Sequence, residues 1–115
     1  YETFNTEDAE VIIIAYGTIS RVCRSAIDEL TDMGVKAGLI RPITLWPFPN
    51  AAIASIVSQP SVKKVLAVEI SAGQMVEDVR LAVNGRKEVA FLGYPGSRIA
   101  TVEEIIAKVK ALRGE

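Results

Sequence analysis

The two side chains that most often carry catalytic or metal chemistry are scarce in this sequence. Its 115 residues include no histidine and a single cysteine, Cys23. Imidazole is the usual general base near neutral pH and a common zinc ligand, and iron–sulfur clusters typically take four cysteine ligands. The sequence therefore excludes mechanisms with an imidazole base, most zinc sites and an iron–sulfur cluster held by this chain alone. Cys23 lies on the apolar stripe of a predicted helix, where a cysteine usually acts as a small core residue.

Gly17 and Thr18 form the first candidate site. They follow a predicted strand and precede a predicted helix, which is a place where α/β proteins bind anions. The sequence lacks the further glycines of a dinucleotide fingerprint and the Gly-Lys-Ser/Thr of a P-loop. A tight turn followed by an N-cap is therefore the favoured interpretation.

Glu69 is the second candidate, because it ends another predicted strand just before Ser71-Ala-Gly73-Gln74. A carboxylate at this place is either a buried acid–base group with a raised pKa or an acceptor for N–H groups of the following loop and helix. Since no second carboxylate or base stands at a useful spacing, we favour the acceptor role.

The third candidate is the segment from Arg41 to Pro49, which contains Trp46, Phe48 and three prolines. Arginine and aromatic side chains are favoured at the centres of interfaces. The two aromatic residues either contact a partner or cover the end of this domain's own core. The candidate interface or anion contacts are thus Gly17, Thr18, Arg41, Trp46, Phe48, Glu69, Gly73 and Gln74.

Composition indicates one globular domain. Hydrophobic residues make up 50% of the chain and charged residues 23%, and the formal net charge is −1. This balance argues against a nucleic-acid partner, since phosphate binding needs an excess of cations. The longest apolar run, Val11–Tyr16, is far shorter than the ~20 residues of a membrane helix. Tyr1 is not an initiator methionine and no signal-peptide pattern follows it, so we expect an excised piece of a longer polypeptide. A single unpaired cysteine fits a reducing cytoplasm, which is the expected location.

Alternating strand and helix patterns predict an α/β fold, with a mostly parallel sheet covered by helices on both faces. The β-branched run Glu10–Tyr16 is typical of a strand buried on both sides, and Thr101-Val-Glu-Glu104 is a capping box that opens the last helix. Residues 10–115 are expected to form one domain, and residues 1–9 either a linker or a short edge strand. The other strands are expected at 35–40, 62–70 and 88–92, and the other helices at 19–33, after an Asn50 cap, and at 75–83.

Three of these segments together resemble one family. Ala15-Tyr-Gly-Thr18, Arg41-Pro-Ile-Thr-Leu-Trp-Pro-Phe-Pro49 and Val68-Glu-Ile-Ser-Ala-Gly-Gln-Met75 are similar, in this order, to the C-terminal part of the α subunit of 2-oxoacid:ferredoxin oxidoreductases. The resemblance runs from about Tyr1 to Leu112. It implies a transketolase C-terminal-domain-like fold, which is a three-layer αβα sandwich around a mixed, five-stranded sheet.

The resemblance also implies the chemistry of a parent complex. Members of the family are thiamine-diphosphate enzymes with Mg²⁺ and iron–sulfur clusters; they oxidatively decarboxylate a 2-oxoacid, reduce ferredoxin and transfer the acyl group to coenzyme A. Ser71 stands where many 2-oxoglutarate enzymes have Asn, and resembles the form for branched-chain 2-oxoacids such as 2-ketoisovalerate. We expect the cofactors on other domains and subunits, and this fragment to be catalytically silent, packing against those domains and supporting subunit assembly.

Two other functions are weighed against this one. A regulatory module would bind a small anion or nucleotide at the strand ends, near Gly17–Thr18, residues 71–74 and residues 93–98. An unrelated flavodoxin-like protein is disfavoured, because no phosphate-cradling loop follows the first strand.

Overall fold

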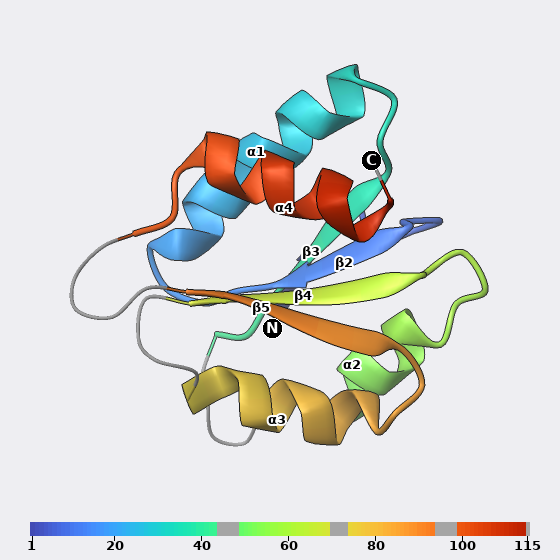
Figure 1. Cartoon of the computed structure of the whole chain (residues 1–115). Helices are drawn as coiled ribbons and strands as arrows, with labels where there is room; N and C mark the ends of the chain where they lie inside the picture. The colour runs from blue at the N-terminus through green and yellow to red at the C-terminus, as the bar shows by residue number, and fades with distance from the viewer. Residues whose placement is uncertain (44–48, 70–73, 94–98, 115) are drawn as a thin grey trace.

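Strands and helices alternate along the chain in the computed structural model, which describes residues 1–43, 49–69, 74–93 and 99–114, with the backbone alone at 74 and 75. Figure 1 shows a sheet with helices on both of its faces. In chain order the elements are β1 (Glu2–Phe4), β2 (Val11–Ile14), α1 (Ile19–Asp32), β3 (Ala37–Arg41), α2 (Asn50–Val57), β4 (Lys64–Glu69), α3 (Gln74–Val83), β5 (Glu88–Gly93) and α4 (Val102–Leu112).

The described strands form one five-stranded mixed sheet in the order β1-β3-β2-β4-β5. The strands β2 to β5 are parallel, whereas β1 pairs antiparallel with β3 and sets Glu2 opposite Arg41. Of the two interpretations of residues 1–9, Glu2–Phe4 therefore forms the edge strand. All the parallel strands end at one edge of the sheet, and this carboxyl edge is where ligands gather in open α/β proteins.

The central strand β2 is buried on both faces, as its β-branched run predicted. Val11 and Ile13 pack with α1 and α4, whereas Ile12 and Ile14 pack with α2 and α3. The helices accordingly divide into two layers, α1 with α4 and α2 with α3 (Figure 1). The predicted three-layer αβα sandwich with a mostly parallel, mixed sheet is confirmed.

The connection from β1 to β2 passes very close to β3 at Gly38. A Cβ atom at this position would lie 2.7 Å from the Asn5 carbonyl oxygen and 2.7 Å from the Thr6 Cα atom. A side chain larger than hydrogen would therefore displace the crossing backbone. The glycine allows the connection to lie directly against β3 and keeps β1 at the edge of the sheet.

The helices begin in different ways. Thr101 caps α4 as predicted, because its hydroxyl oxygen accepts a hydrogen bond from the Glu104 N–H and the Glu104 carboxylate accepts one from the Thr101 N–H. The prediction of an Asn50 cap is wrong: Asn50 is the first residue of α2 and follows Pro49, which has no capping side chain. Thr18 stands at the N-cap of α1, but its hydroxyl makes no capping bond, since its backbone is helical and not extended.

The helices formed by the described residues are all too short or too polar to cross a membrane.

The two N-cap threonines provide a matched test of these assignments. Thr101→Ala removes a capping bond and is expected to lower the free energy of unfolding by about 1 kcal/mol. Thr18→Ala removes the same atoms from the N-cap of α1 without removing a capping bond, so its unfolding free energy should stay close to that of the wild type. Urea unfolding followed by circular dichroism measures both values, and equal losses would contradict the assigned difference.

Candidate functional site

The carboxyl edge of the sheet positions three of the predicted site residues. Gly17 follows β2, Arg41 ends β3 and Glu69 ends β4, and β2 lies between the other two strands. The side chain of Arg41 lies on the α1 face and that of Glu69 on the α3 face, so the sheet separates them. Trp46, Phe48 and Gly73 lie outside the described residues, as does the side chain of Gln74.

Glu69 is a buried carboxylate, with 3% of its surface exposed. Its Oε2 atom accepts a hydrogen bond from the backbone N–H of Val76, in the first turn of α3, at 3.1 Å. The first N–H groups of a helix have no partners within the helix, and a negative charge there is favoured by the helix dipole. The acceptor interpretation of Glu69 is confirmed, and its carboxylate joins the end of β4 to the start of α3.

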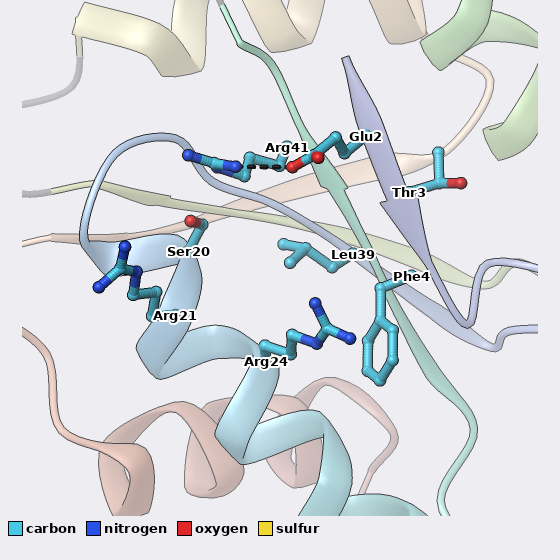
Figure 2. A pocket seen from close by; sticks show the side chains of 8 residues that line it. All are labelled: Glu2, Thr3, Phe4, Ser20, Arg21, Arg24, Leu39 and Arg41. Carbon is cyan, nitrogen blue, oxygen red and sulfur yellow. Dashed lines mark hydrogen bonds and ion pairs between the residues drawn. The ribbon is translucent and has the colours of Figure 1, made fainter.

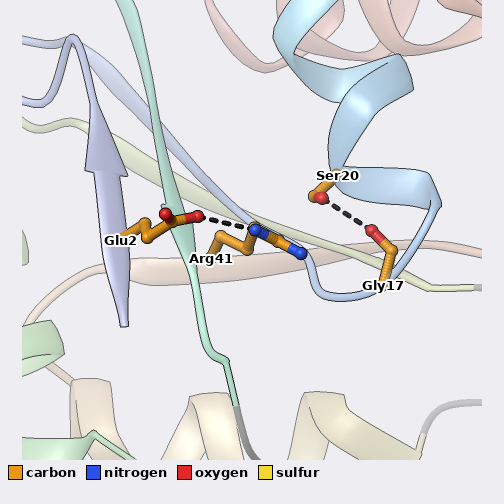
Figure 3. A network of polar contacts seen from close by, with 4 residues as sticks. All are labelled: Glu2, Gly17, Ser20 and Arg41. Carbon is orange, nitrogen blue, oxygen red and sulfur yellow. Dashed lines mark hydrogen bonds and ion pairs between the residues drawn. The ribbon is translucent and has the colours of Figure 1, made fainter.

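The turn at Gly17 is held by a residue that the sequence analysis did not single out. Gly17 adopts a left-handed backbone with φ of +70°. The Ser20 hydroxyl donates to the Gly17 carbonyl oxygen at 2.6 Å (Figure 3). The Ser20 N–H donates to the same oxygen at 3.2 Å. The predicted tight turn is present, but its side-chain hydrogen bond comes from Ser20 and not from Thr18.

Arg41 extends from the end of β3 toward the loop that leads into α1 (Figures 2 and 3). One of its terminal nitrogens donates to Glu2 Oε1 at 2.6 Å. The two side chains are 40% and 62% exposed, so this ion pair contributes about 0–1 kcal/mol to stability. The Nε atom of Arg41 is buried and has no hydrogen-bond partner in the described part of the chain.

A pocket of about 460 Å³ lies beside this ion pair, between β1 and the first turns of α1 (Figure 2). Leu39 supplies apolar surface inside it, and the guanidinium carbon of Arg24 lies 4.2 Å from the centre of the Phe4 ring. A cation over an aromatic face is attracted by the electrons of the ring, which restricts where the Arg24 side chain rests. Arg21 lines the pocket from the preceding turn of the same helix.

Sequence reasoning named Arg41 but missed the two arginines of α1. Arg21 and Arg24 are three residues apart and so lie on neighbouring turns of one helix face. One signal was available, because α1 carries these cations in its first half and its acidic residues in its second half, which is the reverse of what a helix dipole favours. The acidic residues are Asp28, Glu29 and Asp32.

Cys23 is fully buried in the core between the sheet and α1, as predicted. Burial raises the pKa of its thiol from the ordinary value of 9.0 to about 12. The thiolate is the reactive form of cysteine, so this side chain serves as core packing. Among the described residues, no three or more His, Cys, Asp or Glu side chains are grouped in a way that could hold a metal ion.

Comparison with solved structures places this architecture in a known class. A split-gene transketolase, an inactive β4 tetramer, superimposes with a TM-score of 0.75 over 90% of this chain and 38% of that chain. The two sequences are only 16% identical, so the match shows a shared fold and no more. It agrees with the transketolase C-terminal-like fold that the sequence motifs implied.

Residues 9–105 match the family model of pyruvate:ferredoxin oxidoreductase core domain II. The chain belongs to this family, and its resemblance to 2-oxoacid:ferredoxin oxidoreductase α subunits is confirmed.

Ketoisovalerate oxidoreductase subunit VorB of Methanothermobacter marburgensis is 38% identical over all 115 residues, which cover 32% of VorB. The 2-oxoglutarate:ferredoxin oxidoreductase of Magnetococcus marinus, solved with 2-oxoglutarate, coenzyme A and succinyl-CoA bound, is 27% identical with a TM-score of 0.78, over 96% of this chain and 19% of that chain. The chain thus spans about a third of the length of the curated relative.

Glu69 yields a stability prediction. Glu69→Ala leaves the Val76 N–H buried without its acceptor and is expected to lower the free energy of unfolding by about 1–3 kcal/mol. Glu69→Gln keeps an acceptor oxygen and should cost less. The control is Glu77→Ala, which removes a carboxylate of the same helix that is 75% exposed and pairs with Arg80, and should change stability by no more than about 0.5 kcal/mol. Thermal and urea unfolding measure these stabilities. Equal stability of the Glu69→Ala and Glu77→Ala variants would contradict the stabilising role of the hydrogen bond between Glu69 and the Val76 N–H.

The pKa of Cys23 gives a prediction for thiol labelling and for alkaline pH. A rise from 9.0 to about 12 lowers the thiolate fraction roughly a thousandfold, so iodoacetamide should label the folded chain far more slowly at pH 8 than the chain in urea. Because the unfolded thiol ionises above pH 9 while the folded thiol stays protonated, stability should fall between pH 9 and 12, and Cys23→Ala should remove that part of the loss. An exposed cysteine on the same helix, Ser25→Cys in the Cys23→Ala background, is the control and should react rapidly. Equal labelling rates for Cys23 and this control would contradict the assignment.

Proposed function

We propose that this chain is a non-catalytic structural and assembly domain in the α subunit of a thiamine-diphosphate-dependent 2-oxoacid:ferredoxin oxidoreductase. The parent complex oxidatively decarboxylates a 2-oxoacid, transfers the acyl group to coenzyme A and passes the two electrons to ferredoxin in the cytoplasm. The observation that carries this proposal is the family match over residues 9–105, together with the similarity to VorB along the whole chain.

The proposed substrate is a branched-chain 2-oxoacid such as 2-ketoisovalerate. The similarity to a ketoisovalerate oxidoreductase subunit covers every residue of the chain at 38% identity. Ser71, in the segment after Glu69, supports the same choice, since many 2-oxoglutarate enzymes resemble this segment but carry Asn at that position.

The non-catalytic role is supported by how the polar groups at the carboxyl edge are used. The Glu69 carboxylate accepts a hydrogen bond from the start of α3, and the Ser20 hydroxyl donates to the Gly17 carbonyl oxygen. The Cys23 thiol lies in the core, where burial raises its pKa and disfavours the reactive thiolate. Each of these groups stabilises the chain's own fold, which is how a supporting domain uses buried polar side chains.

The iron–sulfur clusters of the parent complex do not fit this chain. Its single cysteine and lack of histidine cannot supply the four thiolates that an iron–sulfur cluster typically takes. The described residues also contain no group of three or more His, Cys, Asp or Glu side chains that could hold a metal ion. We therefore place thiamine diphosphate, Mg²⁺, the iron–sulfur clusters and coenzyme A on the other domains of the α subunit and on the other subunits, which are the proposed partners.

The proposed contacts with those partners lie at the carboxyl edge of the sheet. Ile43 follows β3 and is 56% exposed, and Ile99 precedes α4 and is 41% exposed. Ile43 adjoins the sequence segment that carries Trp46 and Phe48, whose residue types are favoured at interface centres. Coverage of this edge by neighbouring domains would remove these apolar side chains from water.

A domain exchange tests the assembly role. This chain would replace the corresponding 115 residues of VorB, and the chimera would be purified with the other subunits and assayed with 2-ketoisovalerate, coenzyme A and methyl viologen. The chimera is expected to assemble and to keep kcat within about tenfold of unmodified VorB complex, which is about 1.4 kcal/mol in the barrier. A chimera that assembles but loses kcat by about a thousandfold would contradict the non-catalytic role, and failure to assemble would contradict the assembly role.

Two further assays test the remaining parts of the proposal. The 115-residue chain alone, supplied with thiamine diphosphate, Mg²⁺ and coenzyme A, should show no 2-oxoacid-dependent reduction of methyl viologen, and measurable reduction would refute the proposal. The complex that contains the full polypeptide carrying this chain should show a higher kcat/KM for 2-ketoisovalerate than for 2-oxoglutarate or pyruvate. A preference for either of the other two acids would overturn the substrate assignment.

A further inference from the structure

We propose that the pocket between β1 and α1 binds the phosphate group of a small phosphorylated molecule. The inference rests on the arginines that line this pocket and on the charge pattern of α1, and it does not depend on the proposed oxidoreductase role. Figure 2 shows the pocket on the α1 face of the sheet, at the edge formed by β1.

The charge of the pocket matches a phosphate dianion. The residues that line it include three arginines, Arg21, Arg24 and Arg41, and one glutamate, Glu2, so their formal charges sum to two positive. Guanidinium groups present planar pairs of N–H donors whose geometry fits phosphate oxygens. The whole chain carries a formal charge of −1, so this local excess of cations is not a general property of the sequence.

The charges of α1 favour an anion at its start and disfavour the helix when no anion is present. Its first turn contains no acidic residue and its last turn no basic residue, and Arg21 is its third residue. A cation near a helix N-terminus and anions near its C-terminus are each unfavourable by a few tenths of a kcal/mol or more. In α4 the order is the favourable one, with Glu103 and Glu104 in the first turn and Lys110 in the last. The reversed order in α1 therefore has a physical cost, which a bound anion beside Arg21 and Arg24 would offset.

The pocket is also shaped before any ligand arrives. Its volume of about 460 Å³ lies in the range of small-molecule sites and is large for a single phosphate group. The Arg24 guanidinium rests over the Phe4 ring, and the Leu39 side chain and this ring provide apolar surface next to the charged groups. We infer that the remaining space accommodates the organic part of a phosphorylated molecule.

Glu2 acts in this proposal as the chain's own competitor for the ligand. Its carboxylate already accepts a hydrogen bond from one terminal nitrogen of Arg41, while the Arg41 Nε has no partner among the described residues. Both side chains are substantially exposed, so the ion pair is weak enough to be exchanged. A phosphate that enters the pocket can take the place of the Glu2 carboxylate and use more of the Arg41 donors.

The test is a titration of the ¹⁵N-labelled chain followed by NMR at low salt, with inorganic phosphate, ADP, adenosine and acetate as probes. Phosphate or ADP should shift the backbone signals of the first turn of α1 and the arginine Nε–H signals in a saturable way. Arg24→Gln and Arg21→Gln should each weaken binding by about tenfold, the loss expected for a hydrogen bond to a charged group. Glu2→Gln should tighten it.

The control is Arg80→Gln, which makes the same change of charge on α3, on the opposite face of the sheet. It should leave the affinity unchanged. The melting temperature of each variant without ligand shows that it is folded, and exposed ion pairs of this kind cost little to remove.

The outcomes separate the sources of the phosphate group and the ways in which the proposal fails. Saturable binding of inorganic phosphate as tight as that of ADP supports a free phosphate, whereas tighter binding of ADP supports a phosphorylated organic ligand. Binding of adenosine or acetate as tight as that of ADP would overturn the proposal, as would binding of neither phosphate nor ADP. An equal loss in Arg80→Gln and Arg24→Gln would show non-specific attraction, and weaker binding in Glu2→Gln would contradict the competition for Arg41.

Discussion

The enclosure of β2 is the constraint on which the rest of this structure depends. The strand is hydrogen-bonded to β3 on one side and to β4 on the other, and its side chains point alternately into two separate cores. A parallel strand buried in this way needs helices on both faces, and the chain supplies them as α1 with α4 and as α2 with α3. Because β2, β3, β4 and β5 run in the same direction, each of them ends at the same edge of the sheet.

The sheet nevertheless keeps the polar features of this edge apart. On the α3 face, the carboxylate of Glu69 is buried and satisfies a helix N-terminus. On the α1 face, the first turn of α1 contains no acidic residue, and three arginines are among the residues that line an open pocket. The first turn of α3 thus receives a negative charge from Glu69, whereas the first turn of α1 carries the cation Arg21.

The fold could be predicted from the sequence because its signals are local. The β-branched run of β2, the helical spacing of α1 and the capping box at Thr101 each depend on residues close together in the chain, and the observed bounds differ from the predicted ones by at most a few residues. The cap predicted at Asn50 was wrong because Pro49 occupies the N-cap position and Asn50 is already the first residue of the helix. The acceptor role of Glu69 could also be predicted, because the helix whose N–H group it binds starts only a few residues later in the sequence.

The pocket could not be predicted, because it depends on a pairing between distant parts of the chain. Glu2 meets Arg41 across 39 positions, through the antiparallel pairing of β1 with β3. The sequence did not identify β3 as the neighbour of β1, so nothing placed Glu2 and Phe4 beside Arg21 and Arg24. Only the reversed charge order of α1 marked that helix as unusual.

The residue at position 38 indicates whether a related protein can form this pocket. A Cβ atom at that position would overlap the backbone of the chain as it crosses from β1 to β2. A homologue with alanine or any bulkier residue there must route its N-terminal segment differently, and the wall that β1 provides would shift or disappear. A glycine at position 38 thus identifies family members that can keep the pocket between β1 and α1. Any other residue there indicates a relative in which this side of α1 is more open to solvent.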